Sequence, residues 1–417
     1  MVSGEYPPMK GGVGRYTHHL VNALKKSNKR NIDVCIVTNS HKEKANTDIT
    51  SSIADVKNTV VHQDIDNSND DNNGIFHGIT KKGDRKNSDR LLDLIQQLKP
   101  DIVNIQYERG LYEIDTTVGH MFMRILHGST LDKFYKKCPV PTVSTLHTLF
   151  PYSEYKEYIK ERALRKEGRF AFLPLPLRAA IRKWVMNQRY GLLQEVVRLS
   201  SDIISPANTI RKIVKRGTVI YHGAEPAQPS LSAANKQEFR KQFGLPNDKR
   251  FLLAFGYVGS YKGFDILDNL SLPKEWSLVV KQNKHERGLE QPLRINNAIN
   301  LSLGHIDDVT LSKLFFACDA IIFPYRIVSV SGVLFDALAH GLPFVASNLE
   351  FFREFEEMQL GLTCNRNAKS FSDSITNLAE DYNRYKENVQ RFNPKLRWSN
   401  IANDHIEFYS KLLKPSP

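Results

Sequence analysis

Residues 329–347 read SVSGVLFDALAHGLPFVAS and follow the order strand, loop, helix, turn and strand. Ser331 is a favourable N-cap, and the backbone N–H groups of Gly332 and Val333 would point out of the predicted helix start. A glycine and a proline, Gly341 and Pro343, end the helix before the second strand. Such a unit places a helix N-terminus at the carboxyl edge of a sheet, which is a natural site for an anion.

Short apolar runs alternate with amphipathic helical patterns on both sides of this unit, which predicts parallel α/β sheets. The first series of predicted strands is Ile32–Val37, Asp101–Tyr107, Val140–Leu146, Asp202–Pro206 and Val219–His222, and the second is Phe251–Phe255, Ser277–Val280, Ala320–Phe323 and Phe344–Ala346. A turn-rich stretch separates them. We therefore predict two α/β domains, residues 1–224 and 225–417. The polar helical segment from Ser370 closes the second domain or crosses to the first.

Length and composition set the class of protein. A chain of 417 residues suggests two domains, and 58 basic against 45 acidic residues give a net charge of +13. That charge favours acidic partners such as phosphorylated metabolites, anionic lipid or nucleic acid. Four scattered cysteines argue against a disulfide scaffold or a zinc site, and predict a reducing, cytoplasmic location. No apolar run approaches the roughly 20 residues that span a bilayer.

Two local features carry no ligand prediction. The Asp- and Asn-rich stretch Asp66–Asn73 is interpreted as a surface loop without a metal role. Only three residues precede Gly4, where a core strand usually has about five, so we expect the natural start to lie upstream.

A glycine-rich loop near the start of the chain is a second candidate ligand site. Gly11 and Gly12 stand between a short strand and a helical pattern, so backbone amides can approach phosphate or sugar hydroxyls there. An ordinary tight turn explains the same glycines. A third candidate is Lys262, a cation beside a predicted helix start that can neutralise a leaving phosphate. The alternative for Lys262 is a solvated surface lysine.

Several motifs, in order, resemble the retaining GT-B glycosyltransferases of family 4. The matching stretches are 4–16 (GEYPPMKGGVGRY), 100–107 (PDIVNIQY), 145–147 (TLH), 219–223 (VIYHG), 304–308 (GHIDD) with 317–324 (ACDAIIFP), and the helix unit quoted first. The resemblance covers nearly the whole chain. It implies two Rossmann-like domains facing a central cleft, with a nucleotide diphosphate sugar bound mainly by the second domain and an acceptor mainly by the first.

The resemblance implies roles residue by residue. Lys262 matches a lysine that contacts donor phosphates. Gly332 and Val333 match the helix start over the pyrophosphate, and Asp336 matches the second acid of an E-x7-E motif that contacts the ribose. Among the donor-side candidates we also include Glu354, which stands where the family often has a glutamate. Solvation of its helix explains Glu354 equally well.

His147 is the predicted catalytic residue, because it matches a family histidine near the reacting sugar, where an imidazole can donate a proton. Capping of a strand-to-helix turn is the alternative. If the reaction is retaining, no protein nucleophile need appear. We predict no cofactor and no metal, since no D-x-D motif stands at a strand end and helix amides with basic side chains can replace a divalent cation.

The sequence also departs from the family pattern. Val328 occupies the position of the first acid of the E-x7-E motif, and Tyr257 and Gly259 stand where a phosphate arginine is usual. Arg326 is our candidate for the compensating charge. Loss of two charged contacts would weaken donor binding, which leaves a catalytically degenerate scaffold as an alternative.

A basic helical insert lies at about 155–198 of the first domain. Its residues 155–189 contain ten basic and three acidic side chains, with an apolar stripe from Leu177 through Trp184 to Leu192 that runs beside Arg178 and Arg182. This pattern is typical of a helix lying on an anionic membrane. The alternative is that the stripe packs on the first domain's sheet and the charges are solvated.

These observations predict a two-domain hexosyltransferase acting on a lipid-linked or polysaccharide hydroxyl, cytoplasmic or peripheral at the inner face of a membrane. Other enzymes of the same fold, such as a small-molecule glycoside synthase, a phosphorylase or an epimerase, are alternatives, as is a non-catalytic nucleotide-sugar-binding protein. Nucleic acid is not a predicted partner, because net charge alone supports it.

Overall fold

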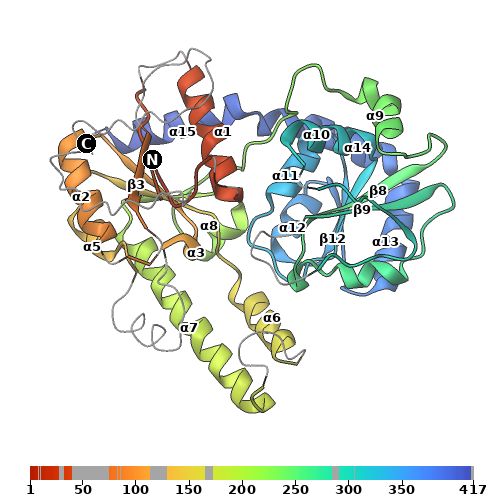
Figure 1. Cartoon of the computed structure of the whole chain (residues 1–417), viewed down its shortest axis with the longest axis horizontal. Coiled ribbons are helices and arrows are strands. Elements are labelled where there is room, and N and C mark those ends of the chain that lie inside the picture. Colours follow the sequence, from red (N-terminus) through yellow and green to blue (C-terminus); the bar gives the residue numbers. More distant parts are fainter. Residues whose placement is uncertain are drawn as a thin grey trace, which may run out of the picture.

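The protein consists of two α/β domains lying side by side, with a helical arm that projects from the first domain (Figure 1). The structure is a computed structural model. It describes residues 1–7, 9, 11–27, 32–39, 75–81, 83–84, 86–112, 129–164, 172–283, 291–304 and 306–414. The predicted α/β class and two Rossmann-like domains are confirmed. The loop predicted at Asp66–Asn73 lies outside the described residues.

The first sheet has seven described strands, all parallel, in the order β3-β2-β1-β4-β5-β6-β7. They are β1 (Val2–Ser3), β2 (Ile36–Asn39), β3 (Ile75–Thr80), β4 (Val103–Tyr107), β5 (Thr142–Leu146), β6 (Asp202–Ser205) and β7 (Thr218–Val219). The helices of this domain are α1 (Gly12–Lys26), α2 (Asn87–Leu98), α3 (Arg109–Tyr112), α5 (Asp132–Lys137), α6 (Tyr152–Leu164), α7 (Leu175–Leu199) and α8 (Asn208–Val214). Only β3 was not predicted.

The second sheet has six described parallel strands in the order β10-β9-β8-β11-β12-β13. They are β8 (Arg250–Tyr257), β9 (Trp276–Asn283), β10 (Ala298–Asn300), β11 (Ala320–Phe323), β12 (Phe344–Ser347) and β13 (Gly361–Cys364). Its helices are α9 (Lys236–Gln242), α10 (Asp308–Ala317), α11 (Gly332–Ala339), α12 (Glu350–Glu356), α13 (Ala368–Glu380) and α14 (Tyr382–Phe392), with 3-10 turns at Ala233–Asn235, Ser260–Lys262, Phe264–Asn269 and Asn393–Leu396. The edge strands β10 and β13 were not predicted.

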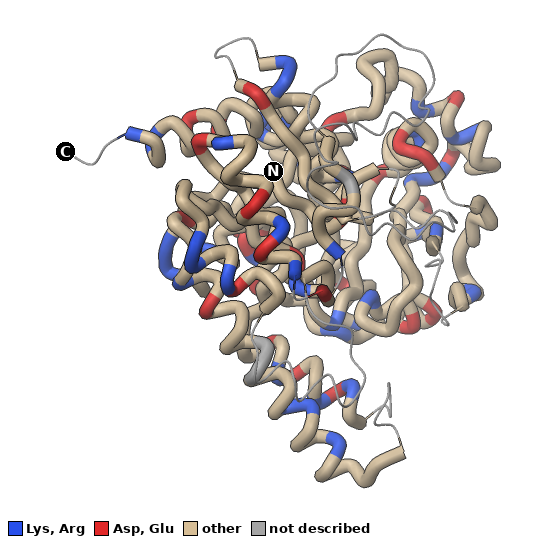
Figure 2. The backbone as a smooth tube through the Cα atoms, turned by 60° about the vertical axis from the view of Figure 1, so that its left-hand side comes forward, with Lys and Arg blue, Asp and Glu red and all other residues tan. Residues whose placement is uncertain are grey.

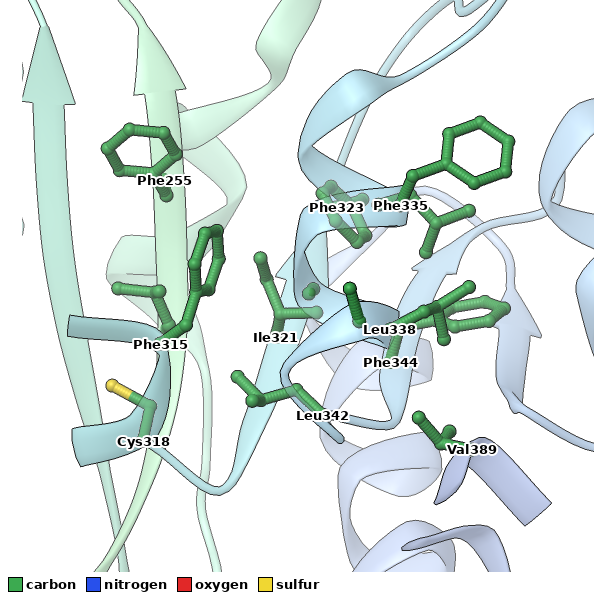
Figure 3. Packing of buried hydrophobic residues seen from close by; sticks show 14 of the residues in the cluster. Phe255, Phe315, Cys318, Ile321, Phe323, Phe335, Leu338, Leu342, Phe344 and Val389 are labelled. Carbon is green, nitrogen blue, oxygen red and sulfur yellow. The ribbon is translucent and has the colours of Figure 1, made fainter. Parts of the chain in front are cut away.

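Aromatic packing fixes the position of α11 on this second sheet. Phe335 and Leu338 of α11 pack with Phe323 and Phe344 of the sheet in one buried cluster (Figure 3). Burial of such side chains contributes about 1.5–3 kcal/mol each. The N-terminus of α11 is therefore held rigidly at the carboxyl edge of the sheet.

The last helix, α15 (Trp398–Leu412), leaves the second domain and packs along α1 of the first domain (Figure 1). Both alternatives left open for the segment from Ser370 are found, because α13 and α14 close the second domain and α15 crosses to the first. The reason is the apolar face of α15: Trp398 and Ile401 join Tyr16 and Leu20 in one buried cluster. The chain therefore crosses between the domains twice.

The basic insert forms the arm, made of α6 and the first half of α7 (Figure 1). One expectation is wrong here, because the arginines beside the apolar stripe were expected at the surface. Arg178 and Arg182 are buried, whereas Leu177 and Trp184 are exposed. The second half of α7 packs into the first domain through Leu193 and Val196. Residues 165–171 lie outside the described part of the chain.

Candidate active site

Elements of both domains meet around His222, which follows the last strand of the first sheet. Its ring stacks on Phe335 of α11 at 5.7 Å and lies 4.8 Å from the ring of Tyr16 of α1, measured between centroids. A Cβ atom on Gly332, the first residue of α11, would lie 3.5 Å from Nε2 of His222. The starts of α1 and α11 thus face each other across one imidazole. The VIYHG motif contained His222, but we had not assigned it to the site.

His147 lies next to this group, at the end of β5. Its Nε2 is 2.8 Å from Oε1 of Gln106, and its ring meets Tyr16 edge-on at 4.9 Å. Burial, and secondarily the nearby His222, lower the pKa of His147 to about 3. The imidazole is therefore neutral at pH 7 and can exchange one proton with a bound hydroxyl. Its catalytic role stays a prediction.

The predicted helix start at Ser331 is confirmed. Ser331 is the N-cap of α11, and its hydroxyl accepts a hydrogen bond of 3.3 Å from the backbone N–H of Leu334. Gly332 and Val333 are the first two helical residues and are half-buried. Since the first N–H groups of a helix have no partner within the helix, this end favours an anion.

Lys262 lies beside that helix start, 8% exposed, and is linked to it by one tyrosine. Its Nζ donates to the hydroxyl of Tyr325 and stands 3.8 Å from that ring's centroid. The Tyr325 hydroxyl also bonds the side chain of Ser331. Burial lowers the pKa of Lys262 to about 7. In the described part of the chain no carboxylate forms an ion pair with this amine.

The glycine loop is built as predicted, with Gly11 as the N-cap of α1 and Gly12 as its first residue. A Cβ on Gly11 would overlap the carboxylate of Glu5, whereas nothing lies within 4 Å of a Cβ on Gly12. A carboxylate at this point favours sugar hydroxyls, which donate hydrogen bonds, over a second phosphate. Ligand binding here stays a prediction.

Arg326 does not stand free for a phosphate. Its guanidinium makes two bonds with Asp265, of 2.9 and 2.6 Å, and lies 3.9 Å from Glu161 of the arm. The Arg326 side chain is also only 11% exposed, so it has little room to turn toward a phosphate, and its role as the compensating charge stays a prediction. The sequence separation of 61 residues from Asp265 explains why the pair was missed.

Asp336 is buried and faces α1. Arg15 holds both its carboxylate oxygens, at 2.8 and 3.4 Å, and also donates at 2.9 Å to Asp308 of α10. A cavity of about 580 Å³ adjoins this cluster, lined by α1, the interdomain segment 223–227, α10, α11 and α15. Arg15 and Asp308 lie in quoted motifs, but nothing local in the sequence pairs them.

Glu354 is neither solvated nor free for the donor. Its carboxylate accepts the backbone N–H groups of Asn208 (3.0 Å) and Thr209 (3.1 Å) at the start of α8, and the hydroxyl of Tyr221 (3.1 Å). This residue of the second domain therefore caps a helix of the first. The donor-side prediction for Glu354 is replaced by a role at the domain junction.

Glu354→Gln is expected to lower the free energy of unfolding by about 2 kcal/mol, because it removes a charge that accepts several buried hydrogen bonds. Chemical denaturation measures the change. The matched control is Glu357→Gln, an exposed position one residue beyond the same helix, where we expect less than about 0.5 kcal/mol. Equal effects of the two substitutions would contradict the capping role.

Some known proteins match parts of this sequence, and some solved structures have a similar fold. Residues 269–381 match the family model described as glycosyl transferases group 1. An uncharacterised glycosyltransferase of Methanocaldococcus jannaschii is 25% identical over 230 residues, 51% of this chain and 57% of that relative. The match thus spans little more than half of the relative's length.

Solved structures of similar fold align over almost the whole chain. Sucrose-phosphate synthase from Thermosynechococcus elongatus has a TM-score of 0.62 at 13% identity and covers 99% of this chain and 98% of that one. Anabaena HepE in complex with UDP-glucose has a TM-score of 0.59 at 13% identity, with 98% and 99% covered.

The fold and the family match define the class of protein. The chain has the GT-B fold, and residues 269–381 match the group 1 glycosyl transferase model. The resemblance to GT-B glycosyltransferases seen in the sequence is thereby confirmed.

Proposed function

We propose that the protein transfers a hexosyl group from a nucleoside diphosphate sugar to a hydroxyl of a lipid-linked or polysaccharide acceptor, with retention of configuration. One observation carries the donor side of this proposal: Lys262 is buried, has no carboxylate partner among the described residues, and lies beside the amide groups that begin α11. A buried amine is costly unless an anion joins it, and a diphosphate supplies that charge. HepE, which shares the fold, binds UDP and UDP-glucose.

The geometry supports a direction for the bound donor. The pyrophosphate lies at Gly332 and Val333, and the nucleoside extends along α11 toward Asp336 and the adjoining cavity. The sugar then faces His222 and His147. Both histidines are neutral at pH 7, because burial lowers the pKa of His222 to about 4 and that of His147 to about 3. As neutral imidazoles they can donate or accept hydrogen bonds and so orient sugar hydroxyls.

Donor binding is tested by thermal shift with UDP-, GDP- and ADP-sugars on the wild type, Lys262→Ala and the exposed control Lys274→Ala. A ligand that binds only the native state raises its melting temperature. We expect one nucleotide class to stabilise the wild type and the control but not Lys262→Ala. No shift with any donor in the wild type would favour a catalytically degenerate scaffold. That alternative is supported by the buried Val328 in place of an acid and by Tyr257 in place of an arginine. Product analysis then separates a transferase from an epimerase or phosphorylase.

We also propose that the arm binds an anionic membrane surface, which would bring a lipid-linked acceptor to the cleft. No described helix has the length and apolar character needed to cross a bilayer. The arm tip exposes Phe172 (80%) and Leu177 (50%), together with Leu164 and Leu175. Residues 155–189 contain ten basic and three acidic side chains, and Figure 2 shows blue segments along the arm.

The acids of the arm face the second domain. Glu157 and Glu161 both pair with Arg366, at 3.1 and 2.8 Å. Lys156 and Lys160 of the same helix are exposed to solvent. An anionic bilayer attracts lysines through its surface charge and accepts apolar side chains at its interface, so exposed leucines flanked by lysines favour binding to it.

Vesicle sedimentation tests the arm. At about 0.1 M salt, where surface charge is still felt over roughly 10 Å, the wild type should sediment with vesicles containing phosphatidylglycerol and not with neutral vesicles. Leu177→Asp should abolish that binding. The control Leu293→Asp, in the second domain and 47% exposed, should not. Failure of the wild type to bind the anionic vesicles would remove the membrane proposal and leave the donor proposal standing.

A further inference from the structure

Among the described residues, few positive charges surround the phosphate site at the start of α11. A nucleoside diphosphate sugar carries about two negative charges, and Lys262, with its pKa lowered to about 7, supplies at most one positive charge. His147 and His222 are neutral there, Arg326 is held by Asp265, and position 257 is a tyrosine. A donor bound in this site therefore needs another cation.

We propose that Arg15 is that cation: donor binding moves its guanidinium from Asp336 to the pyrophosphate at the start of α11 and frees Asp336 for the ribose. Arg15 follows the glycine loop by one helical turn, on the face of α1 that meets the second domain. Its fork of N–H groups, which now fits a carboxylate with two bonds, fits a phosphate equally well. The proposal rests on the proposed function, because it names a further residue of the same donor site.

The required movement is short. Asp336 is four residues beyond Gly332 in α11, which is about 6 Å along the helix axis. Tyr16, the neighbour of Arg15, and Gly332 both lie against His222, so the first turns of the two helices are already adjacent. The Arg15 side chain is 36% exposed, and the cavity beside it leaves room for rotation without a backbone shift.

The exchange also resolves a competition at Asp336. Its side chain is 5% exposed and both oxygens face Arg15, so ribose hydroxyls cannot bind this carboxylate while the ion pair persists. A phosphate that attracts Arg15 opens the ribose contact. Asp308 accepts a hydrogen bond from Nε–H of Arg15 and also lies 3.4 Å from His19. When Arg15 moves away, His19 therefore remains beside Asp308.

Calorimetric titration with inorganic pyrophosphate, UDP and uridine tests the proposal on wild type, Arg15→Gln, Arg15→Lys, Asp336→Asn and Lys25→Gln. Lys25→Gln is the control, since it removes the same charge from an exposed position of α1. We expect Arg15→Gln to weaken pyrophosphate binding about tenfold or more, Arg15→Lys to weaken it less, and Lys25→Gln to leave it unchanged. Asp336→Asn releases Arg15 and should tighten pyrophosphate binding. The binding of uridine, which has no phosphate, should not weaken in Arg15→Gln.

Two results would overturn the proposal separately from the proposed function. If pyrophosphate binding is lost in Lys262→Ala but kept in Arg15→Gln, the donor site is supported. Arg15 then only joins the two domains through its ion pair with Asp336. Absence of pyrophosphate and UDP, GDP or ADP binding in the wild type removes both. If Arg15→Gln does not fold, Asp336→Asn decides, because unchanged or weaker pyrophosphate binding in that variant contradicts release of Arg15.

Discussion

Lys262→Met is expected to raise the stability of the free protein and, at the same time, to abolish donor binding. The amine is 8% exposed and no described carboxylate pairs with it, so its charged form is disfavoured by burial. Methionine fills a similar volume without charge. Loss of the charged contact should weaken a nucleoside diphosphate about 10- to 100-fold, and transfer by more than that.

The size and sign of the stability gain follow from the pKa. A fall from 10.5 to about 7 bounds the gain below pH 7 at about 5 kcal/mol. Between these two values the unfolded chain binds the proton and the folded protein does not. The free energy of unfolding of the wild type therefore rises with pH across this window, and the advantage of Lys262→Met shrinks toward pH 10.5.

Denaturant unfolding at several pH values, together with nucleoside diphosphate titration, measures both effects. The control is Lys274→Met, an exposed lysine of the same domain, which should change neither. A Lys262→Met protein that is less stable than the wild type at pH 7, or that binds donor as tightly, would show that the amine serves packing and not an anion.

The parts of the site that local sequence determines were predicted correctly. Ser331 caps α11, Gly12 begins α1, and Lys262 lies beside a helix start, because capping and turn geometry depend on residues a few positions apart. The sheets followed from apolar runs. Edge strands such as β13, Gly361–Cys364, were missed because a short half-exposed strand has no distinctive pattern.

Errors concentrate where the two domains meet. Arg15 and Asp336 are 321 residues apart, and Glu354 and Asn208 are 146 apart, so no spacing rule connects them. For the same reason the sequence left open whether the helices after Ser370 close the second domain or cross to the first. Arg178 and Arg182 are buried in the arm, where charge alone predicted solvent. Arg15, Asp336 and Glu354, in contrast, have partners that only the fold brings within reach.

Gly263→Ala should cost far more stability than the same substitution at Gly244, and should also remove donor binding. Both glycines have left-handed backbones, with φ of 67° and 66°, a conformation that costs other residues about 1–2 kcal/mol. A Cβ on Gly244 meets nothing within 4 Å, whereas one on Gly263 would overlap the carbonyl oxygen of Pro324. Because Pro324 precedes Tyr325, relief of that overlap displaces the partner of Lys262.

We expect the free energy of unfolding to fall by about 1 kcal/mol in Gly244→Ala and by about 3 kcal/mol or more in Gly263→Ala. Equal losses, or undiminished nucleoside diphosphate binding by a folded Gly263→Ala, would show that the 324–325 segment does not position Lys262.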